Sequence, residues 1–194
     1  MSLQGSSLAG SSTTRDRVEN DYYATPFESV ESLLKVEKFS GDFIEPCVGG
    51  GHIANVIKSY YPKSNIIGID IIDRGYENTI INSYFDYTFS GNYNIITNPP
   101  YKLAQEFIEH SLKQLSNGKK IAMFLKIQFL EGVRRKDFFK KNPPKTIYVF
   151  SKRQNPMRDG EPTDENGKPW SSTMCFAWFV WEKGYKSNPI IKWI

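Results

Sequence analysis

The turn Asn98-Pro99-Pro100-Tyr101 offers the groups best suited to chemistry in this chain. It follows the apolar run 93–97, and an open α/β sheet places its ligand chemistry at the carboxyl ends of strands. Proline fixes its own φ and restricts the residue before it, so the turn is stiff. Asn98 offers a side-chain carbonyl, the prolines offer backbone carbonyls and Tyr101 offers a flat ring. These groups suit the binding of a planar group that bears an NH2, although a rigid strand-to-helix turn is an equally simple interpretation.

A second turn, at 45–51, places three glycines between a short apolar run and a helical pattern. Glycine has no Cβ, so a ligand can touch the backbone, and the helix start offers free N–H groups. Asp70 ends the next apolar run about 20 residues later, which is the spacing of an acidic residue that binds ribose hydroxyls. Asp73 is a competing candidate, and a strand-end cap is the structural alternative. The glycine spacing differs from the dinucleotide fingerprint and argues against a nicotinamide cofactor.

Asp86 follows a third, weaker apolar run at 79–82. Its carboxylate would accept a hydrogen bond from an adenine amine, with Phe85 or Tyr87 against the ring. A surface turn accounts for Asp86 almost as well.

The segment from Lys119 to Arg153 contains eleven basic and two acidic residues, although the net charge of the chain is only +4. A solvated helix face explains part of this excess. A polyanion partner explains the rest, because phosphate contacts supply most sequence-independent affinity. The predicted phosphate contacts are Arg134, Arg135, Arg153 and Arg158.

Strand patterns alternate with helical patterns, which predicts an α/β fold with a mostly parallel sheet and helices on both faces. Seven strands are expected, near 43–46, 65–70, 79–82, 93–97, 120–125, 145–150 and 174–181. No helix separates the last two, so they should form an antiparallel hairpin at one edge. Thr25 is predicted as the N-cap of the first helix, with Pro26 at its first position, Glu28 completing a capping box and Gly41 ending it.

The length of 194 residues fits one domain, expected over 19–194 after a flexible tail at 1–18. A long loop at 152–172 should join the last two strands. Cys47 and Cys175 are expected as two buried free thiols in a reducing cytoplasm, with no metal-binding spacing. No apolar run approaches the ~20 residues that cross a bilayer, so no membrane association is expected.

Five segments, taken in order, resemble the S-adenosylmethionine-dependent amino-methyltransferases with an Asn-Pro-Pro-Tyr turn, particularly small phage-type DNA adenine N6-methyltransferases. The matching segments are 22–26, 45–51, 69–70, 85–86 and 98–101. The resemblance extends from about Asp21 to about Trp181. It implies a Rossmann-like class I methyltransferase fold, S-adenosylmethionine as the cofactor, and transfer of its methyl group to a flipped adenine in DNA.

The resemblance also implies the site. The residues around the methionine part of the cofactor would be Tyr23, Thr25, Pro26, Glu45, Pro46, Cys47, Gly49 and Gly51. Asp70, with Ile71 beside it, would bind the ribose, and Asp86 and Phe85 the adenine. The catalytic turn would comprise Asn98, Pro99, Pro100 and Tyr101, with Tyr101 stacked on the target base.

Two departures from the family keep other functions open. A target-recognition domain of the usual large size is not expected within this sequence, and the loop around Arg158 would supply part of the recognition. The first residue of the turn is Asn rather than Asp, as in protein-glutamine and some RNA methyltransferases. The alternatives are therefore cytosine N4, RNA or protein-glutamine methylation, or a catalytically silent nucleic-acid-binding module. A monomer or weak dimer is expected.

Overall fold

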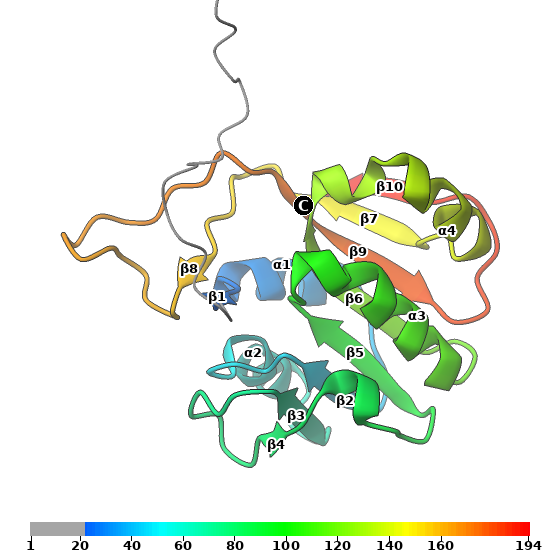
Figure 1. Cartoon of the computed structure of the whole chain (residues 1–194), viewed down its shortest axis with the longest axis horizontal. Helices are drawn as coiled ribbons and strands as arrows, with labels where there is room; N and C mark the ends of the chain where they lie inside the picture. The colour runs from blue at the N-terminus through cyan, green and yellow to red at the C-terminus, as the bar shows by residue number, and fades with distance from the viewer. Residues whose placement is uncertain (1–21) are drawn as a thin grey trace, which may run out of the picture.

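Eight strands form one sheet in the order β10-β7-β9-β6-β5-β2-β3-β4 (Figure 1). The computed structural model describes residues 22–194, so the tail predicted at 1–18 lies outside the described residues. The strands are β1 (Tyr23–Ala24), β2 (Asp42–Pro46), β3 (Ile66–Asp70), β4 (Ile80–Ile81), β5 (Tyr93–Thr97), β6 (Lys120–Lys126), β7 (Thr146–Val149), β8 (Met157–Arg158), β9 (Phe176–Glu182) and β10 (Ile190–Trp193). The α-helices are α1 (Phe27–Val36), α2 (His52–Tyr60), α3 (Ala104–Gln114) and α4 (Lys136–Lys141). Short 3-10 turns are η1 (Tyr84–Asp86), η2 (Tyr101–Leu103), η3 (Ile127–Leu130) and η4 (Val133–Arg135).

The central strands are buried on both faces. Ile95 and Ile96 are consecutive in β5 and fully buried, but they belong to different hydrophobic clusters, because side chains alternate across a strand. Leu33 of α1 and Ile57 of α2 pack in one cluster, and Phe107 of α3 packs in the other. The predicted α/β fold with helices on both faces is therefore confirmed, with one strand more than expected.

The edge of the sheet differs from the prediction. β7 and β9 do pair antiparallel, but β9 lies between β6 and β7 and runs antiparallel to both. β10 pairs parallel with β7 and forms the edge instead. All four residues of β10 are exposed and Pro189 precedes them, so no buried alternation marked this segment as a strand.

The start of α1 also differs from the prediction. Pro26 is the N-cap and no side chain caps the helix, so Thr25 is not the cap and the predicted capping box is absent. Thr25 is 2% exposed, and its hydroxyl has no hydrogen-bond partner among the described residues. The helix ends at Val36, before Gly41, because Glu37 is extended (φ −109°, ψ 130°).

The segment 152–172 lies between β7 and β9 and contains β8. β8 pairs antiparallel with β1, with Tyr23 opposite Arg158 and Ala24 opposite Met157. This two-stranded sheet is separate from the main one and joins the beginning of the described chain to a segment more than 130 residues later.

Two absences hold for residues 22–194. None of their helices is both long and apolar enough to span a membrane. Their His, Cys, Asp and Glu side chains form no group of three that could hold a metal ion.

Candidate active site

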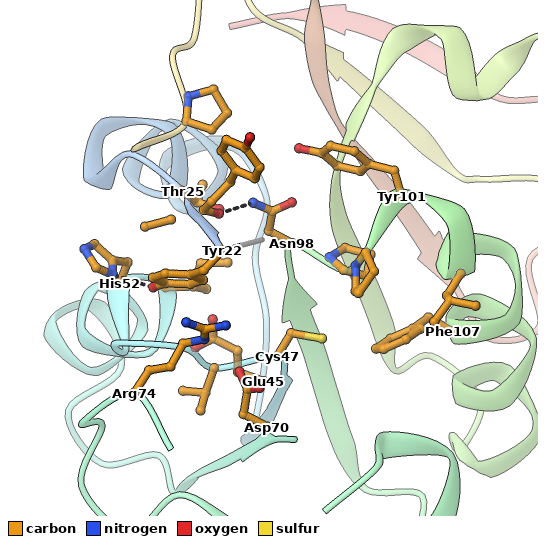
Figure 2. Close-up of a pocket in the computed structure, with 18 of the residues that line it drawn as sticks. Tyr22, Thr25, Glu45, Cys47, His52, Asp70, Arg74, Asn98, Tyr101 and Phe107 are labelled. Carbon is orange, nitrogen blue, oxygen red and sulfur yellow. Dashed lines mark hydrogen bonds between the residues drawn. The ribbon is translucent and has the colours of Figure 1, made fainter. Parts of the chain in front are cut away.

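A cavity of about 740 Å³ opens at the carboxyl ends of β2, β3, β5 and β6. This volume is within the usual range for a small-molecule site, about 300–1,000 Å³. Figure 2 shows Glu45, Cys47 and Asp70 at one end of the cavity, with Asn98 and Tyr101 toward the other. The strand ends therefore bring together side chains that are far apart in the sequence.

Two tyrosines cover the glycine turn. A Cβ on Gly49 would lie 2.3 Å from the ring of Tyr22, and one on Gly51 would lie 2.2 Å from the ring of Tyr76. Both glycines have positive φ (53° and 80°), which L-residues rarely adopt. The Gly50 N–H donates to the Tyr22 hydroxyl at 3.0 Å. The glycines thus admit aromatic rings of the protein itself, and neither Gly49 nor Gly51 lines the cavity.

Asp70 ends β3 and lines the cavity together with Ile71. Its Oδ2 accepts from the Gly49 N–H at 2.9 Å and its Oδ1 accepts from the Ile72 N–H at 3.2 Å. Asp73, the competing candidate, is exposed, accepts from the Gly75 N–H at 2.9 Å, and lies outside the cavity lining. The geometry therefore favours Asp70 as the acidic residue of a nucleotide site.

Two buried oxygens at the cavity have no hydrogen-bond partner among residues 22–194: Thr25 Oγ1 and Glu45 Oε2. Glu45 is 1% exposed, and its burial, together with the charge of Asp70, raises the pKa of its carboxyl well above the usual range, opposed by a hydrogen bond with the Ala54 backbone. Unsatisfied buried acceptors are rare in folded proteins and costly. A ligand that brings hydrogen-bond donors into the cavity would satisfy these oxygens.

Cys47 lines the cavity together with Glu45 and Asp70, and its backbone is left-handed (φ 87°). Burial, followed by the charges of Asp70 and Glu45, raises the pKa of its thiol well above the usual value. Pro46 and Pro26 lie outside the lining. The carbonyl of Pro46 accepts a hydrogen bond from the Thr97 hydroxyl, which joins the ends of β2 and β5.

Asn98 directly follows β5 and lines the cavity with Pro99 and Pro100. Its Nδ2 donates to the backbone carbonyl of Tyr23 at 2.9 Å. In Figure 2 the side-chain oxygen of Asn98 points to the side of Tyr101. The donor half of the amide is thus used within the protein, and the acceptor half faces the cavity.

Tyr101 begins η2 and lies half-buried in the wall. The Nζ of Lys126 lies 5.1 Å from the centre of its ring, and the ring of Phe176 is 6.2 Å away. Burial, and to a lesser degree the nearby Tyr23, raises the pKa of the Tyr101 hydroxyl. The ring is therefore held in place and stays neutral.

Of the two residues predicted to contact adenine, only Phe85 lines the cavity, and Asp86 does not. Phe85 lines the cavity and is 38% exposed. Asp86 is exposed and lies outside the lining, because the chain turns away in η1. Asn82 and Ser83 line the cavity instead. Asn82 and Ser83 belong to no motif that would have identified them as site residues from the sequence.

The four arginines predicted to contact phosphate have different environments. Arg135 Nη1 donates to the carbonyls of Phe129 (3.3 Å) and Glu131 (2.9 Å), so it braces its own turn. Arg153 Nη1 donates to the Thr173 carbonyl at 2.9 Å and to Cys175 Sγ at 3.1 Å. Cys175 is exposed, so the prediction that its thiol is buried is wrong. Arg134 is exposed, and Arg158 lines the main cavity.

Sequence reasoning missed Tyr22 and His52, whose contacts are long-range. The Tyr22 hydroxyl and His52 Nδ1 are 3.0 Å apart, and the His52 ring stacks on Phe27 at 5.3 Å. Burial lowers the pKa of His52, opposed by a hydrogen bond with the Gly160 backbone. His52 also lines the cavity.

The long segment 152–172 forms part of the cavity lining. The Asp159 N–H donates to the Tyr22 carbonyl at 2.9 Å. Across the base of the loop, the Ser172 N–H donates to Asn155 Oδ1 at 2.9 Å. Trp170 lines the cavity and is held by a bond from its Nε1 to the Glu161 carbonyl at 2.8 Å. The loop is therefore a wall of the site.

No protein-family model and no curated protein sequence matches the chain. Solved structures do match its fold. A protein from Listeria monocytogenes, named as a class I S-adenosylmethionine-dependent methyltransferase, aligns with a TM-score of 0.56 at 12% identity over 85% of this chain and 62% of its own. A protein from Agrobacterium tumefaciens, named as an O-methyltransferase, gives 0.60 at 10% identity over 87% and 85%.

The EcoKI M protein of a type I restriction enzyme aligns with a TM-score of 0.55 at 15% identity, over 84% of this chain and 44% of its own. The chain thus spans less than two thirds of the Listeria and EcoKI proteins. The fold of this chain is the Rossmann-like α/β fold of these methyltransferase structures.

Proposed function

We propose that this protein transfers a methyl group from S-adenosylmethionine to the exocyclic amine of adenine in DNA, producing N6-methyladenine. One observation supports this above all. The stiff turn at Asn98 and Pro99 lines the same cavity as Thr25 and Glu45, whose buried oxygens lack partners among the described residues.

The residues of the cavity fit the cofactor. Glu45 and Thr25 would hold its ammonium group, and Asp70 would accept from the ribose hydroxyls. Both oxygens of Asp70 already accept one backbone N–H each, but a carboxylate oxygen has room for a second donor. Phe85 would lie against the adenine. When bound, S-adenosylmethionine supplies an electrophilic methyl group on a sulfonium.

The amine of adenine is a weak nucleophile because its lone pair is delocalised into the ring. Asn98 Oδ1 and the Pro99 carbonyl would each accept one of its hydrogens and favour a pyramidal nitrogen. The prolines fix these acceptors where positive charge develops, and such positioning lowers the barrier. The bond from Asn98 Nδ2 to Tyr23 keeps the acceptor side of the amide toward the substrate.

Tyr101 would stack on the target base. Stacking of a base on an aromatic ring is worth about 1–3 kcal/mol, and extruding a base from a duplex costs a few kcal/mol. Tyr101 therefore offsets much of the extrusion cost without selecting a sequence.

Two findings favour DNA as the substrate. The EcoKI M protein, a structural neighbour, belongs to a restriction enzyme. Lys126 and Arg158 line the cavity, where positive charge would attract phosphates.

The test offers labelled S-adenosylmethionine to duplex DNA, RNA and cell protein in parallel, with mass analysis of the nucleosides. N6-Methyladenine in DNA, lost in Asn98→Ala, is the expected result. N4-Methylcytosine, or label in RNA or protein alone, would overturn the proposal. Cofactor binding with no transfer to any substrate would indicate a silent binding module.

A further inference from the structure

A second cavity, of about 510 Å³, begins on the other side of Tyr101. Tyr101 lines both cavities. The second cavity lies between the start of α3 and the turns η3 and η4, and we call it the η4 groove. Its charged lining residues are Lys102, Glu106, Arg134 and Arg135.

The η4 side of this groove is a braced turn with an apolar residue at its tip. Val133 is 93% exposed, and no other large hydrophobic residue among residues 22–194 has a higher exposed fraction. It follows Gly132, whose φ of 123° allows the sharp turn. The Arg135 guanidinium lies 4.6 Å from the centre of the Phe129 ring and donates to Glu131 O at 2.9 Å. The protein therefore holds Val133 outward in a fixed conformation.

The charge of the groove fits a polyanion. Lys102 and Arg134 are exposed on its two sides, and Arg135 adds positive charge from within the turn. Glu106 is the one acidic residue of the lining, which leaves a positive excess. An exposed apolar side chain between basic residues suits a nucleic-acid strand, because bases offer apolar faces and the backbone offers phosphates.

We infer that the η4 groove binds the DNA strand flanking the target nucleotide, with Lys102 and Arg134 on its phosphates and Val133 against a neighbouring base. This inference rests on the proposed function. A nucleotide held against Tyr101 in the main cavity remains joined to its neighbours. The η4 groove shares Tyr101 with that cavity, so it provides a charged path along which the strand can leave.

The experiment measures binding of fluorescein-labelled, mixed-sequence 24-nucleotide DNA, single-stranded and duplex, by anisotropy across a salt series. Each lost phosphate contact should reduce the magnitude of the slope of log K against log salt by about 0.7 for single strands and about 0.9 for duplex. For duplex DNA at about 0.1 M salt, this change corresponds to a loss of affinity of about eightfold. Lys102→Ala and Arg134→Ala should each show this change. Val133→Asp should weaken binding at least as much, because its carboxylate would repel phosphate.

Matched controls are Lys63→Ala and Val36→Asp. Lys63 is exposed between α2 and β3, at the amino edge of the sheet, and Val36 is 47% exposed at the end of α1. All variants should keep the wild-type melting temperature and affinity for S-adenosylhomocysteine. Slopes for Lys102→Ala and Arg134→Ala equal to that of Lys63→Ala would overturn the inference.

The inference and the proposed function fail in different ways. If the wild-type protein methylates DNA but the groove variants bind it normally, only the groove assignment fails. If the wild-type protein neither binds nor methylates DNA, the proposed function fails and the groove assignment with it. Asn98→Ala should lose transfer and keep the wild-type salt slope.

Discussion

The side-chain amide of Asn98 donates from Nδ2 to the backbone carbonyl of Tyr23 at 2.9 Å. An aspartate at this position would place a carboxylate oxygen against that carbonyl oxygen. Asn98→Asp should therefore lose about 100-fold or more in kcat, which is the usual cost of a lost catalytic hydrogen bond. Protonation of the new carboxyl restores a donor to Tyr23, so the deficit should shrink as pH falls.

The measurement for this variant is kcat/KM for DNA between pH 5.5 and 8.5, with the wild-type profile as reference. Asn98→Ala, which has neither donor nor acceptor, should be inactive at every pH. An Asn98→Asp enzyme as active as wild type at pH 8 would show that the contact with Tyr23 does not orient the amide.

Tyr101 should act through its ring and not through its hydroxyl, whose pKa is raised by burial. Tyr101→Phe is expected to keep the activity within about threefold. Tyr101→Ala should weaken substrate binding by about 1–3 kcal/mol. Substrate titrations with both variants test this, and a Phe variant as defective as the Ala variant would instead assign a role to the hydroxyl.

Glu45 should destabilise the ligand-free protein while it serves the cofactor. Its folded-state pKa is raised, so the folded protein binds more protons than the unfolded chain between the ordinary and the raised pKa. Stability associated with Glu45 is therefore present at low pH and lost as pH rises through the raised value. Glu45→Gln should raise the melting temperature at pH 8, with little change at pH 5.

The same substitution should weaken S-adenosylhomocysteine binding, measured by calorimetry at pH 8, since the neutral amide attracts an ammonium less. In the wild type, affinity should fall as pH drops through the raised pKa of Glu45. A Glu45→Gln protein that melts no higher and binds equally well would contradict both expectations.

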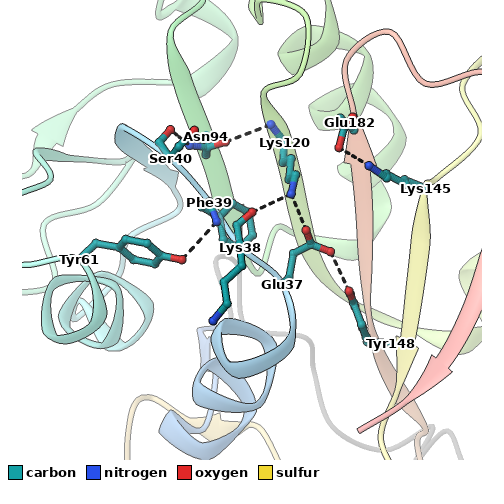
Figure 3. A network of polar contacts seen from close by, with 10 residues as sticks. All are labelled: Glu37, Lys38, Phe39, Ser40, Tyr61, Asn94, Lys120, Lys145, Tyr148 and Glu182. Atoms are coloured by element: carbon teal, nitrogen blue, oxygen red, sulfur yellow. Dashed lines mark hydrogen bonds and ion pairs between the residues drawn. The ribbon is translucent and has the colours of Figure 1, made fainter.

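A polar network joins the end of α1 to the sheet (Figure 3). Lys120 Nζ lies 2.5 Å from Glu37 Oε1, and the Tyr148 hydroxyl donates to Glu37 Oε2 at 2.7 Å. The Lys120 and Glu37 side chains are 17% and 11% exposed. Removing one partner of a buried pair costs about 3–5 kcal/mol; since this pair keeps some solvent contact, Lys120→Met should cost somewhat less, about 2–3.

Lys35→Met is the control for this network, because the Lys35–Glu31 pair is 62% and 43% exposed. An exposed pair is worth less than about 1 kcal/mol. Tyr148→Phe should fall between the two, near 1–2 kcal/mol, since it removes one buried donor. Urea unfolding measures all three, and equal losses for Lys120 and Lys35 would refute this ranking.

Local sequence patterns predicted the central strands of the sheet, because a buried strand is marked by a continuous run of apolar residues. The nearly continuous apolar runs before Asp70 and Asn98 predicted buried parallel strands, and both strands are present. The same patterns predicted that Asp70 and Asn98 lie at strand ends, because each apolar run stops at one of these polar residues.

The remaining features depend on contacts between distant segments. The pairing of β1 with β8 links two-residue strands that have no periodicity. The hydrogen bond between Tyr22 and Gly50, and the turn that carries Asp86 away from the cavity, depend on tertiary packing. Arg134 and Arg135 are adjacent residues of the same type, so the sequence could not distinguish their roles. Only the fold shows that Arg135 stabilises its own turn through a hydrogen bond to the Glu131 carbonyl.

The short strand β1 and the residue before it contact three separate segments around the cavity. Its segment meets the glycine turn through Tyr22, supports Asn98 through Tyr23, and pairs with the loop at Arg158. Whatever steadies the loop is therefore expected also to steady the Glu45 and Asp70 end of the cavity. Because coupling between sites is reciprocal, we expect a ligand bound at that end to order the loop for a second ligand, and the second ligand to strengthen binding of the first.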